Sequence, residues 1–291
     1  MSFSIIFEGI IGGLLIGSVY GVIAIGLTII FGILKIVNFA HGEFLMMGMY
    51  LSYYSCLYLG IDPYTSLLIV VPVMFLMGIL CEVLLIKPVL NAPQDIQILL
   101  TFGVVLVLQN LALLLWTGDW RSLTSPLVFK IVNVGGISLK LTTIIAFLSS
   151  ILLTLLLFLF LKKTDYGKAI RACSDEPEGA LFAGLKLNKV FYLTFGIGTV
   201  LAAIPGALIL PFFSVSPFVG FSFTLQTFII IVLGGLGSIP GALIGGFIVG
   251  VGESLGALFI PGTLKQIVTF VLFIAIVCLK PSGIFGEKQR E

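Results

Sequence analysis

The residue types that usually carry catalysis or metal binding are scarce in this chain. A single histidine, His41, excludes a two-histidine metal site, and no serine or cysteine has a plausible base partner. The sequence holds no G-x-x-x-x-G-K-[ST] motif, so the chain carries no phosphate-binding loop of its own. The four cysteines show no C-x-x-C spacing, which favours free thiols. We therefore expect no catalytic residue, no metal site and no cofactor bound by this chain.

The most unusual local sequence runs from Asn38 to Glu43 and reads N-F-A-H-G-E. It stands between two apolar stretches, where polar groups need partners because unmet hydrogen bonds are costly in hydrocarbon. One interpretation is an interfacial turn in which Asn38 and Glu43 cap helix ends. The other is a broken helix whose exposed backbone lines a translocation cavity, with Asn38, His41 and Glu43 as candidate pathway residues.

Glu253 lies well inside an apolar stretch, where a carboxylate at a helix centre costs about 2.5 to 3.5 kcal/mol on insertion scales. It needs a partner or water. A structural or cavity-lining role is favoured over proton coupling, which usually involves a second ionisable group in mid-membrane. Gln226, Gln109 and Asn110 are interior polar positions typical of interhelical hydrogen bonds. We include Gln226 and Glu253 among the candidate pathway residues.

The segment 162–189 is polar and contains a short predicted helix. Asp175 as N-cap with Glu178 three residues on resembles a capping box, and Gly184 supplies a C-terminal stop. Such a helix is marginal alone in water, which indicates that it docks against something. Leu181 and Phe182 are the expected apolar anchors for a groove of another protein. The alternative is that the helix packs under its own membrane domain.

The composition places these residues in a membrane protein. The chain has 291 residues, of which 59% are hydrophobic and only 10% charged, and its mean hydropathy is +1.24. A soluble domain carries about a quarter charged residues. The net charge of +2 gives no reason to expect a nucleic-acid partner.

Apolar stretches of roughly membrane-spanning length predict an all-α fold, a polytopic bundle of about eight or nine helices in a single domain, residues 1–291. A helix break is expected near residues 35–43. A second break is expected within residues 221–259, at the sequence G-G-L-G-S-I-P-G, which makes that segment either two crossings or a re-entrant pair. The stretches are 9–31, 44–60, 65–86, 96–116, 141–161, 190–211, 221–234, 241–259 and 264–279.

Sidedness follows from the basic residues. Six of them lie in the segment 162–189, which should therefore be cytoplasmic. Counting crossings outward places the N-terminus outside and the C-terminus inside, with eleven of the 15 basic residues on the cytoplasmic side. The four on the outer side are Arg121, Lys130, Lys140 and Lys265, and the cytoplasmic set includes Lys288 and Arg290.

Glycines recur at the spacing that lets helix backbones approach closely in lipid. Gly13, Gly17 and Gly21 form a tandem G-x-x-x-G ridge, and a second group lies near the other end of the chain. We interpret both as helix-contact surfaces, within the chain or with a partner subunit. The second group pairs Gly241 with Gly245, Gly246 with Gly250, and Gly252 with Gly256.

Three sequences in this order and spacing resemble the LivH-type permease subunits of branched-chain amino-acid ABC importers. They are N-F-A-H-G-E at 38–43, G-K-A-I-R-A-C at 167–173 and G-G-L-G-S-I-P-G-A-L-I-G-G at 234–246. The likeness covers essentially the whole chain. The resemblance implies an inner-membrane permease, not an enzyme, that carries amino acids, most often the branched-chain ones.

The resemblance also implies partners: a second permease subunit, two cytoplasmic ABC ATPases that bind ATP and Mg²⁺, and a periplasmic or lipid-anchored substrate-binding protein. The loop helix would couple this chain to the ATPases. Its expected coupling residues are Gly167, Arg171, Asp175, Glu178, Ala180, Leu181, Phe182 and Gly184.

Other classes remain open at this point. The main alternative is an ion-coupled secondary transporter of a small hydrophobic solute, for which Glu253 would serve a midplane site. A membrane enzyme and a channel-like scaffold have less support, since the chain offers neither a nucleophile with a base nor a metal cluster.

Overall fold

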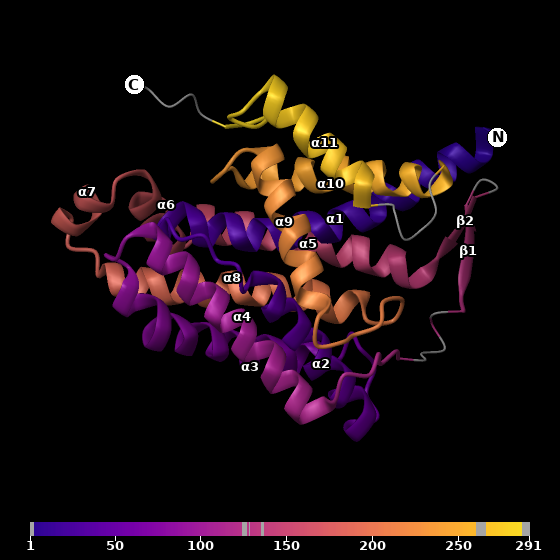
Figure 1. Cartoon of the computed structure of the whole chain (residues 1–291), viewed down its shortest axis with the longest axis horizontal. Coiled ribbons are helices and arrows are strands. Elements are labelled where there is room, and N and C mark those ends of the chain that lie inside the picture. Colours follow the sequence, from indigo (N-terminus) through magenta and orange to yellow (C-terminus); the bar gives the residue numbers. More distant parts are fainter. Residues whose placement is uncertain (1–2, 124–126, 128, 135–136, 260–265, 287–291) are drawn as a thin grey trace.

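The computed structural model describes residues 3–123, 127, 129–134, 137–259 and 266–286, so that Lys265, Lys288 and Arg290 lie outside the described residues. The described residues are mostly helical, and the helices form one elongated bundle (Figure 1). The helices of the bundle are α1 (Phe3–Leu34), α2 (His41–Leu59), α3 (Leu67–Cys81), α4 (Gln94–Trp116), α5 (Leu141–Lys163), α8 (Leu187–Ile209), α9 (Val219–Gly234), α10 (Ile239–Phe259) and α11 (Gln266–Leu279).

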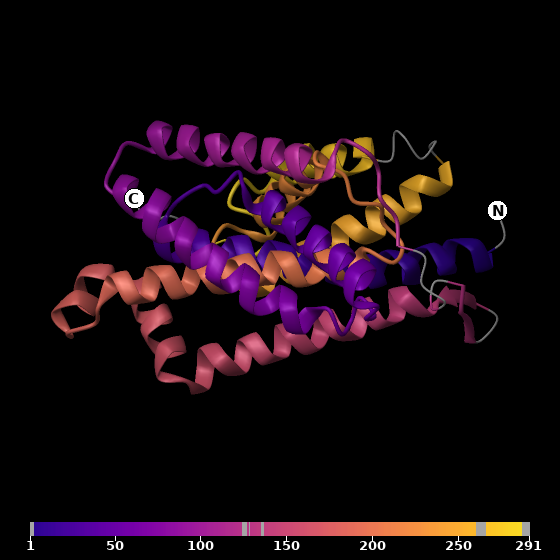
Figure 2. The same ribbon diagram turned by 90° about the horizontal axis from the view of Figure 1, so that it is seen from below.

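Six of the described helices are long and apolar enough to cross a membrane. They are α1, α3 together with the adjoining π-helical turn η1 (Glu82–Ile86) and 3₁₀ turn η2 (Lys87–Val89), α4, α5, α8 and α10. α4 and α5 are the peripheral ones, with 22% of their apolar windows buried, and they flank the bundle on opposite edges in Figure 2. The predicted polytopic helical bundle is confirmed.

α1 and α10 pack backbone to backbone along their glycines. A Cβ on Gly13 or on Gly17 would lie within 3 Å of the carbonyl oxygen of Gly250 or Gly246, respectively. Both predicted glycine groups therefore form helix contacts within the chain. In the second group, Gly241 and Gly245 lie against α9, while Gly252 and Gly256 lie against α11.

The helix break predicted near residues 35–43 is confirmed, and it lies deep in the bundle. α1 ends at Leu34, and α2 begins at His41. The Nε2 atom of His41 donates to the carbonyl oxygen of Ile23 at 2.9 Å. Ile23 is eleven residues before the end of α1, which is about 16 Å along a helix. The break is therefore buried within the bundle, which favours the interpretation as a broken helix, and neither Asn38 nor Glu43 caps α2.

The second predicted break separates α9 from α10 at residues 235–238. Gly235 has φ +103°, which favours glycine. α9 has 16 residues, about 24 Å of helix, against a hydrocarbon core of about 30 Å. In Figure 1 it runs across the direction of α1. The N–H groups of Ile284 and Phe285 donate to the carbonyl oxygens of Leu233 and Gly234, which fastens the chain after α11 to the end of α9.

The two ends of the bundle carry different structures. One end holds the start of α1 and an antiparallel hairpin of β1 (Ile131–Val134) and β2 (Ile137–Lys140), which the sequence did not predict (Figure 1). The opposite end holds two short helices, α6 (Asp165–Asp175) and α7 (Pro177–Phe182). The basic segment and the N-terminal end of α1 thus lie at opposite ends of the molecule.

Aromatic residues stack between α2 and the end of α4. The rings of Tyr50 and Trp116 lie 4.2 Å apart, and the Arg121 guanidinium lies 5.8 Å from the centre of the Tyr54 ring. Arg121 and Val215 exchange two backbone hydrogen bonds, which tie the chain after α4 to the chain after α8. Tyrosine, tryptophan and arginine in such an arrangement are typical of a membrane–water interface.

Candidate functional site

The first polar cluster lies where α2 begins. The Glu43 side chain is fully buried, and its Oε1 accepts a hydrogen bond from Gln109 Nε2 of α4 at 2.9 Å. Its Oε2 has no hydrogen-bond partner among the described residues and faces Gly220 of α9, where a Cβ would lie 2.5 Å away. A buried carboxylate oxygen without a partner is unfavourable. Glu43 is therefore a buried polar group whose hydrogen bonds the described residues satisfy only on one side.

Asn38 and His41 occupy the same break. Asn38 Oδ1 accepts from the N–H of Ala40 at 3.1 Å, while the N–H of Gly42 donates to Thr224 Oγ1 of α9 at 3.0 Å. Asn38 Nδ2 and His41 Nδ1 are buried and have no partner within the described part of the chain. The structure thus brings the three predicted residues of the break together and leaves hydrogen-bonding atoms on each of them.

The second polar cluster centres on Glu253 of α10, which is 7% exposed. Gln226 Nε2 of α9 and Thr269 Oγ1 of α11 donate to its Oε1 at 2.6 and 3.1 Å. Tyr20 of α1 donates to its Oε2 at 3.2 Å. The carboxylate therefore joins four helices. The structure brings the predicted residues Gln226 and Glu253 into direct contact.

The two clusters lie against different faces of α9. Gly220 and Thr224 face the start of α2, whereas Phe223 packs on the ring of Tyr20 and Gln226 reaches Glu253. α9 thus stands between the two buried carboxylates. α9 is therefore in polar contact with both clusters.

Sequence reasoning identified the carboxylates better than their partners. Gln109 was predicted to make an interhelical hydrogen bond, and it does so with Glu43. Asn110 was assigned the same role, which is wrong, since it donates to the carbonyl oxygen of Leu106 in its own helix. Tyr20 and Thr269 were not predicted. Tyr20 is 233 residues from Glu253 in sequence, and no local pattern marks such a pairing.

α6 is fastened to the bundle. The Thr164 hydroxyl caps it by accepting from the N–H of Gly167 at 3.0 Å. Gly167 lies so close to the backbone of Leu161 in α5 that no larger residue fits. Ser174 donates to the carbonyl oxygen of Gly32 in α1 at 3.3 Å. Cys173 is on the same inner face, and burial raises the pKa of its thiol.

The predicted capping of the next helix is wrong at its first residue. Asp175 ends α6, and Glu176 occupies the N-cap position of α7 without a side-chain hydrogen bond. The cause is that α6, once capped at Thr164, continues to Asp175, whose backbone is therefore helical and cannot take the extended N-cap geometry. The stop at Gly184 is confirmed. Its φ of +83° ends the helix, and the N–H of Leu185 donates back to the Ala180 carbonyl at 3.1 Å.

α7 presents apolar side chains to the outside. Phe182 is 87% exposed and Leu181 57% exposed, whereas Ala180 is buried against the chain. Glu178 and Arg171 are exposed nearby. In Figure 1, α7 projects from the end of the bundle. Large apolar groups exposed on a short helix are unfavourable in water unless a partner covers them.

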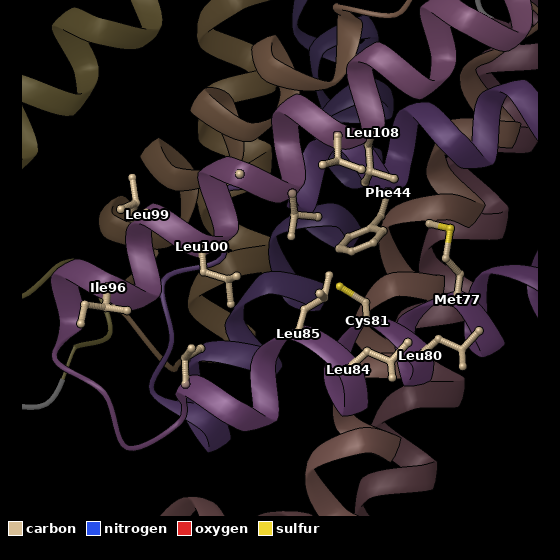
Figure 3. A pocket seen from close by; sticks show the side chains of 14 residues that line it. Phe44, Met77, Leu80, Cys81, Leu84, Leu85, Ile96, Leu99, Leu100 and Leu108 are labelled. Atoms are coloured by element: carbon tan, nitrogen blue, oxygen red, sulfur yellow. The ribbon is translucent and has the colours of Figure 1, made fainter.

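A large apolar hollow in the surface does not involve these residues. It lies between α3, η1 and α4 and has a volume of about 730 Å³. Figure 3 shows its walls, including Phe44, Cys81 and Leu100. Apart from the weakly hydrogen-bonding thiol of Cys81, its lining side chains are apolar and offer no partner to a charged solute. We therefore place the candidate site at the polar clusters and not in this groove.

The bundle of apolar helices, its buried carboxylates Glu43 at the start of α2 and Glu253 within α10, and its projecting apolar helix are the features of a multi-pass membrane permease. The chain belongs to the family described as the permease component of the branched-chain amino acid transport system, which matches residues 9–277. This confirms the resemblance found in the sequence.

Several curated proteins are similar to the chain over nearly its whole length. The high-affinity branched-chain amino acid transport system permease protein LivH of Escherichia coli (strain K12) is 34% identical over 96% of this chain and 95% of the relative. The corresponding permease BraD of Pseudomonas aeruginosa is 31% identical over 98% and 97%. A probable LivH of Methanocaldococcus jannaschii is 28% identical over 96% and 92%. No solved structure matches.

Proposed function

We propose that this chain is the permease subunit of an ABC importer that carries leucine, isoleucine and valine across the bacterial inner membrane. The family and the names of the relatives support the substrate class. The observation that carries the coupling mechanism is the exposure of Leu181 and Phe182 on α7. Because the sequence has no phosphate-binding loop, energy from ATP must arrive through a docked protein.

The proposed assembly contains this chain, a second permease subunit, two cytoplasmic ABC ATPases and a periplasmic or lipid-anchored substrate-binding protein. ATP and Mg²⁺ are bound by the ATPases. The segment 162–189 faces the cytoplasm, which places the N-terminus outside and the C-terminus inside. The excess of basic residues in this segment supports this orientation.

The coupling residues divide into a docking part and a transmitting part. On α7, Leu181 and Phe182 enter an ATPase groove, with Glu178 at the first turn and Ala180 against the chain. On α6, Gly167 holds the helix to α5, and Arg171 faces outward. A displacement of α7 then moves α6 as a rigid element.

The transmission continues into the membrane through α1. The Ser174 hydroxyl of α6 donates a hydrogen bond to the Gly32 carbonyl near the end of α1. The backbones of α1 and α10 are in direct contact at their glycines, so that the two helices should move together. α10 carries Glu253, which is bonded to α9. Closure of the ATPase pair would thereby shift α9 relative to the start of α2 and alternate access to the pathway residues Asn38, His41, Glu43, Gln226 and Glu253.

The test is purification of the tagged chain from mild detergent with mass spectrometry of the proteins that remain bound. We expect two ATPases and a second permease, and we expect the reconstituted assembly to take up leucine only with ATP. A chain that purifies alone and still transports would overturn the proposal.

The buried carboxylates Glu43 and Glu253 favour one second candidate, an ion-coupled secondary transporter. In that case uptake would persist without ATP hydrolysis and would stop when an ionophore collapses the ion gradient. The same vesicles, assayed with each treatment, separate the two functions.

A further inference from the structure

A small polar notch opens on the outward face of α9 and α11. Ser222, Gln226 and Thr269 line it together with the Glu253 carboxylate, and its volume is about 50 Å³. Ser222 is exposed, and Phe270 at the rim is 45% exposed. The notch therefore brings a carboxylate to the surface of a helix bundle that lies in a membrane.

The outward faces of α4 and α5 are different. Exposed side chains there are mainly leucines, such as Leu114 and Leu155. The exposed amide of Asn110 on α4 donates one hydrogen bond to the carbonyl oxygen of Leu106 in its own helix, and it carries no charge. An apolar face suits lipid, whereas ionisable groups in membrane segments face protein or a water-filled cavity. The notch is thus on the side that a second subunit or water must cover.

Glu253 is held by three neutral donors and no cation. Its partners are the hydroxyl groups of Tyr20 and Thr269 and the amide of Gln226. The salt bridge found among the described residues joins Lys168 and Asp165. Both of these residues are in α6, so the pair does not involve the notch. A carboxylate has about four acceptor positions. Two donors occupy Oε1 and one occupies Oε2, so that Oε2 retains one position for a further donor.

We propose that this notch faces the passage between the chain and a second permease subunit, and that Glu253 binds the ammonium group of the transported amino acid there. The inference rests on the proposed function and assigns a chemical role to one of its pathway residues. The ammonium group supplies both the missing charge and the missing donor. Tyr20, Gln226 and Thr269 are positioning residues that fix the carboxylate.

The experiment measures thiol accessibility in the assembled, reconstituted complex. Ser222→Cys is made in a chain whose four native cysteines are replaced by serine, and Leu155→Cys on α5 is the matched lipid-facing control. Each is treated with methanethiosulfonate reagents that do not cross membranes, one carrying a quaternary ammonium and one a sulfonate. Leucine uptake is measured in the same vesicles before labelling.

We expect Ser222→Cys to react and Leu155→Cys not to react, with the cationic reagent faster by about tenfold or more because a carboxylate concentrates cations in a narrow site. Leucine should slow the reaction, and adding Glu253→Gln should abolish the charge preference. If Ser222→Cys is as unreactive as the control in vesicles that transport leucine, the notch faces lipid and the inference is wrong while the proposed function stands.

Equal rates with both reagents, unchanged by Glu253→Gln, would also overturn the ammonium site. A further probe is 4-methylpentanoate, which is leucine without its ammonium group. It should not protect Ser222→Cys at concentrations at which leucine does, and protection by both compounds would contradict the assignment. Loss of all ATP-dependent uptake in the parent complex would instead reject the proposed function.

Discussion

Gly17 of α1 lies against Gly246 of α10 so closely that a Cβ on Gly17 would be 2.7 Å from the Gly246 carbonyl oxygen. Apolar side chains gain nothing by leaving apolar lipid, so helix association in a membrane depends on such van der Waals contact. The pair α1–α10 also carries the hydrogen bond from Tyr20 to Glu253. The glycine contact therefore fixes the helix spacing on which the Glu253 cluster depends.

We predict that Gly17→Ala lowers thermal stability in detergent, because the added methyl group forces two backbones apart. Overpacking of this kind typically costs about 1 to 3 kcal/mol. The matched control is Gly103→Ala on α4, where a Cβ would have no atom within 4 Å. That change should be neutral or stabilising, since alanine favours a helix over glycine. Equal melting temperatures for the two variants would contradict the prediction.

We predict that Leu181→Asp and Phe182→Asp each abolish co-purification of the ATPases, because a charge placed in an apolar groove loses its solvation without gaining a partner. Insertion into the membrane should be unaffected, since both side chains are exposed and contribute little to the fold. Phe182→Leu is the control that keeps an apolar side chain and should retain most binding. Unchanged ATPase recovery with both aspartate variants would reject α7 as the docking helix.

The sequence predicted those features that local chemistry determines. Pro240 and the glycines around it marked the break between α9 and α10, and the polar residues from Asn38 to Glu43 marked the start of α2. The spacing of Gly13, Gly17 and Gly21 predicted a contact surface, which the structure places against α10. In each case a few neighbouring residues are enough for the prediction. Glycine and proline determine locally where a helix can break, and glycine spacing determines locally where another helix backbone can approach.

Pairings between distant helices escaped prediction. Nothing in the sequence near Tyr20 or Thr269 indicates that both donate to Glu253, because the relation exists only once four helices are packed. The N-cap of α7 was predicted at the wrong residue because of a local competition, not a distant contact. Asp175 has the right residue type for a cap, but the preceding helix, begun at Thr164, extends through it. Local propensity decides such a boundary only when no neighbouring helix competes for the residue.

We predict that Gly167→Val uncouples ATP hydrolysis from transport while the ATPases remain bound. The new side chain would collide with the backbone of α5 at Leu161, which separates α6 from the bundle without altering the docking residues of α7. Leucine uptake should fall several-fold, and ATPase recovery in the pull-down should be unchanged. The control is Lys168→Ala, at an exposed position one residue along α6. Joint loss of binding and transport would contradict a purely transmitting role.

We predict that the hydrogen bond between Glu43 and Gln109 gives a measurable coupling energy in a double-mutant cycle of unfolding free energies. Gln109→Met leaves the buried Glu43 carboxylate without this partner, which costs about 1 to 3 kcal/mol, and Glu43→Met leaves the partly buried Gln109 amide unpaired at a smaller cost. The double variant removes both groups and should be less destabilised than the sum, by roughly 0.5 to 3 kcal/mol. Asn110→Met, next in sequence but exposed and bonded only within α4, should be nearly neutral.

Stability and transport should then diverge in the double variant. In the double variant neither partner of the broken hydrogen bond is left behind, so the loss of stability should be small. If Glu43 lines the pathway, uptake of leucine should nevertheless fall at least about tenfold, as expected when a buried polar contact to a solute is lost. Strict additivity in unfolding measurements, or full transport by the double variant, would reject a shared role for the two residues.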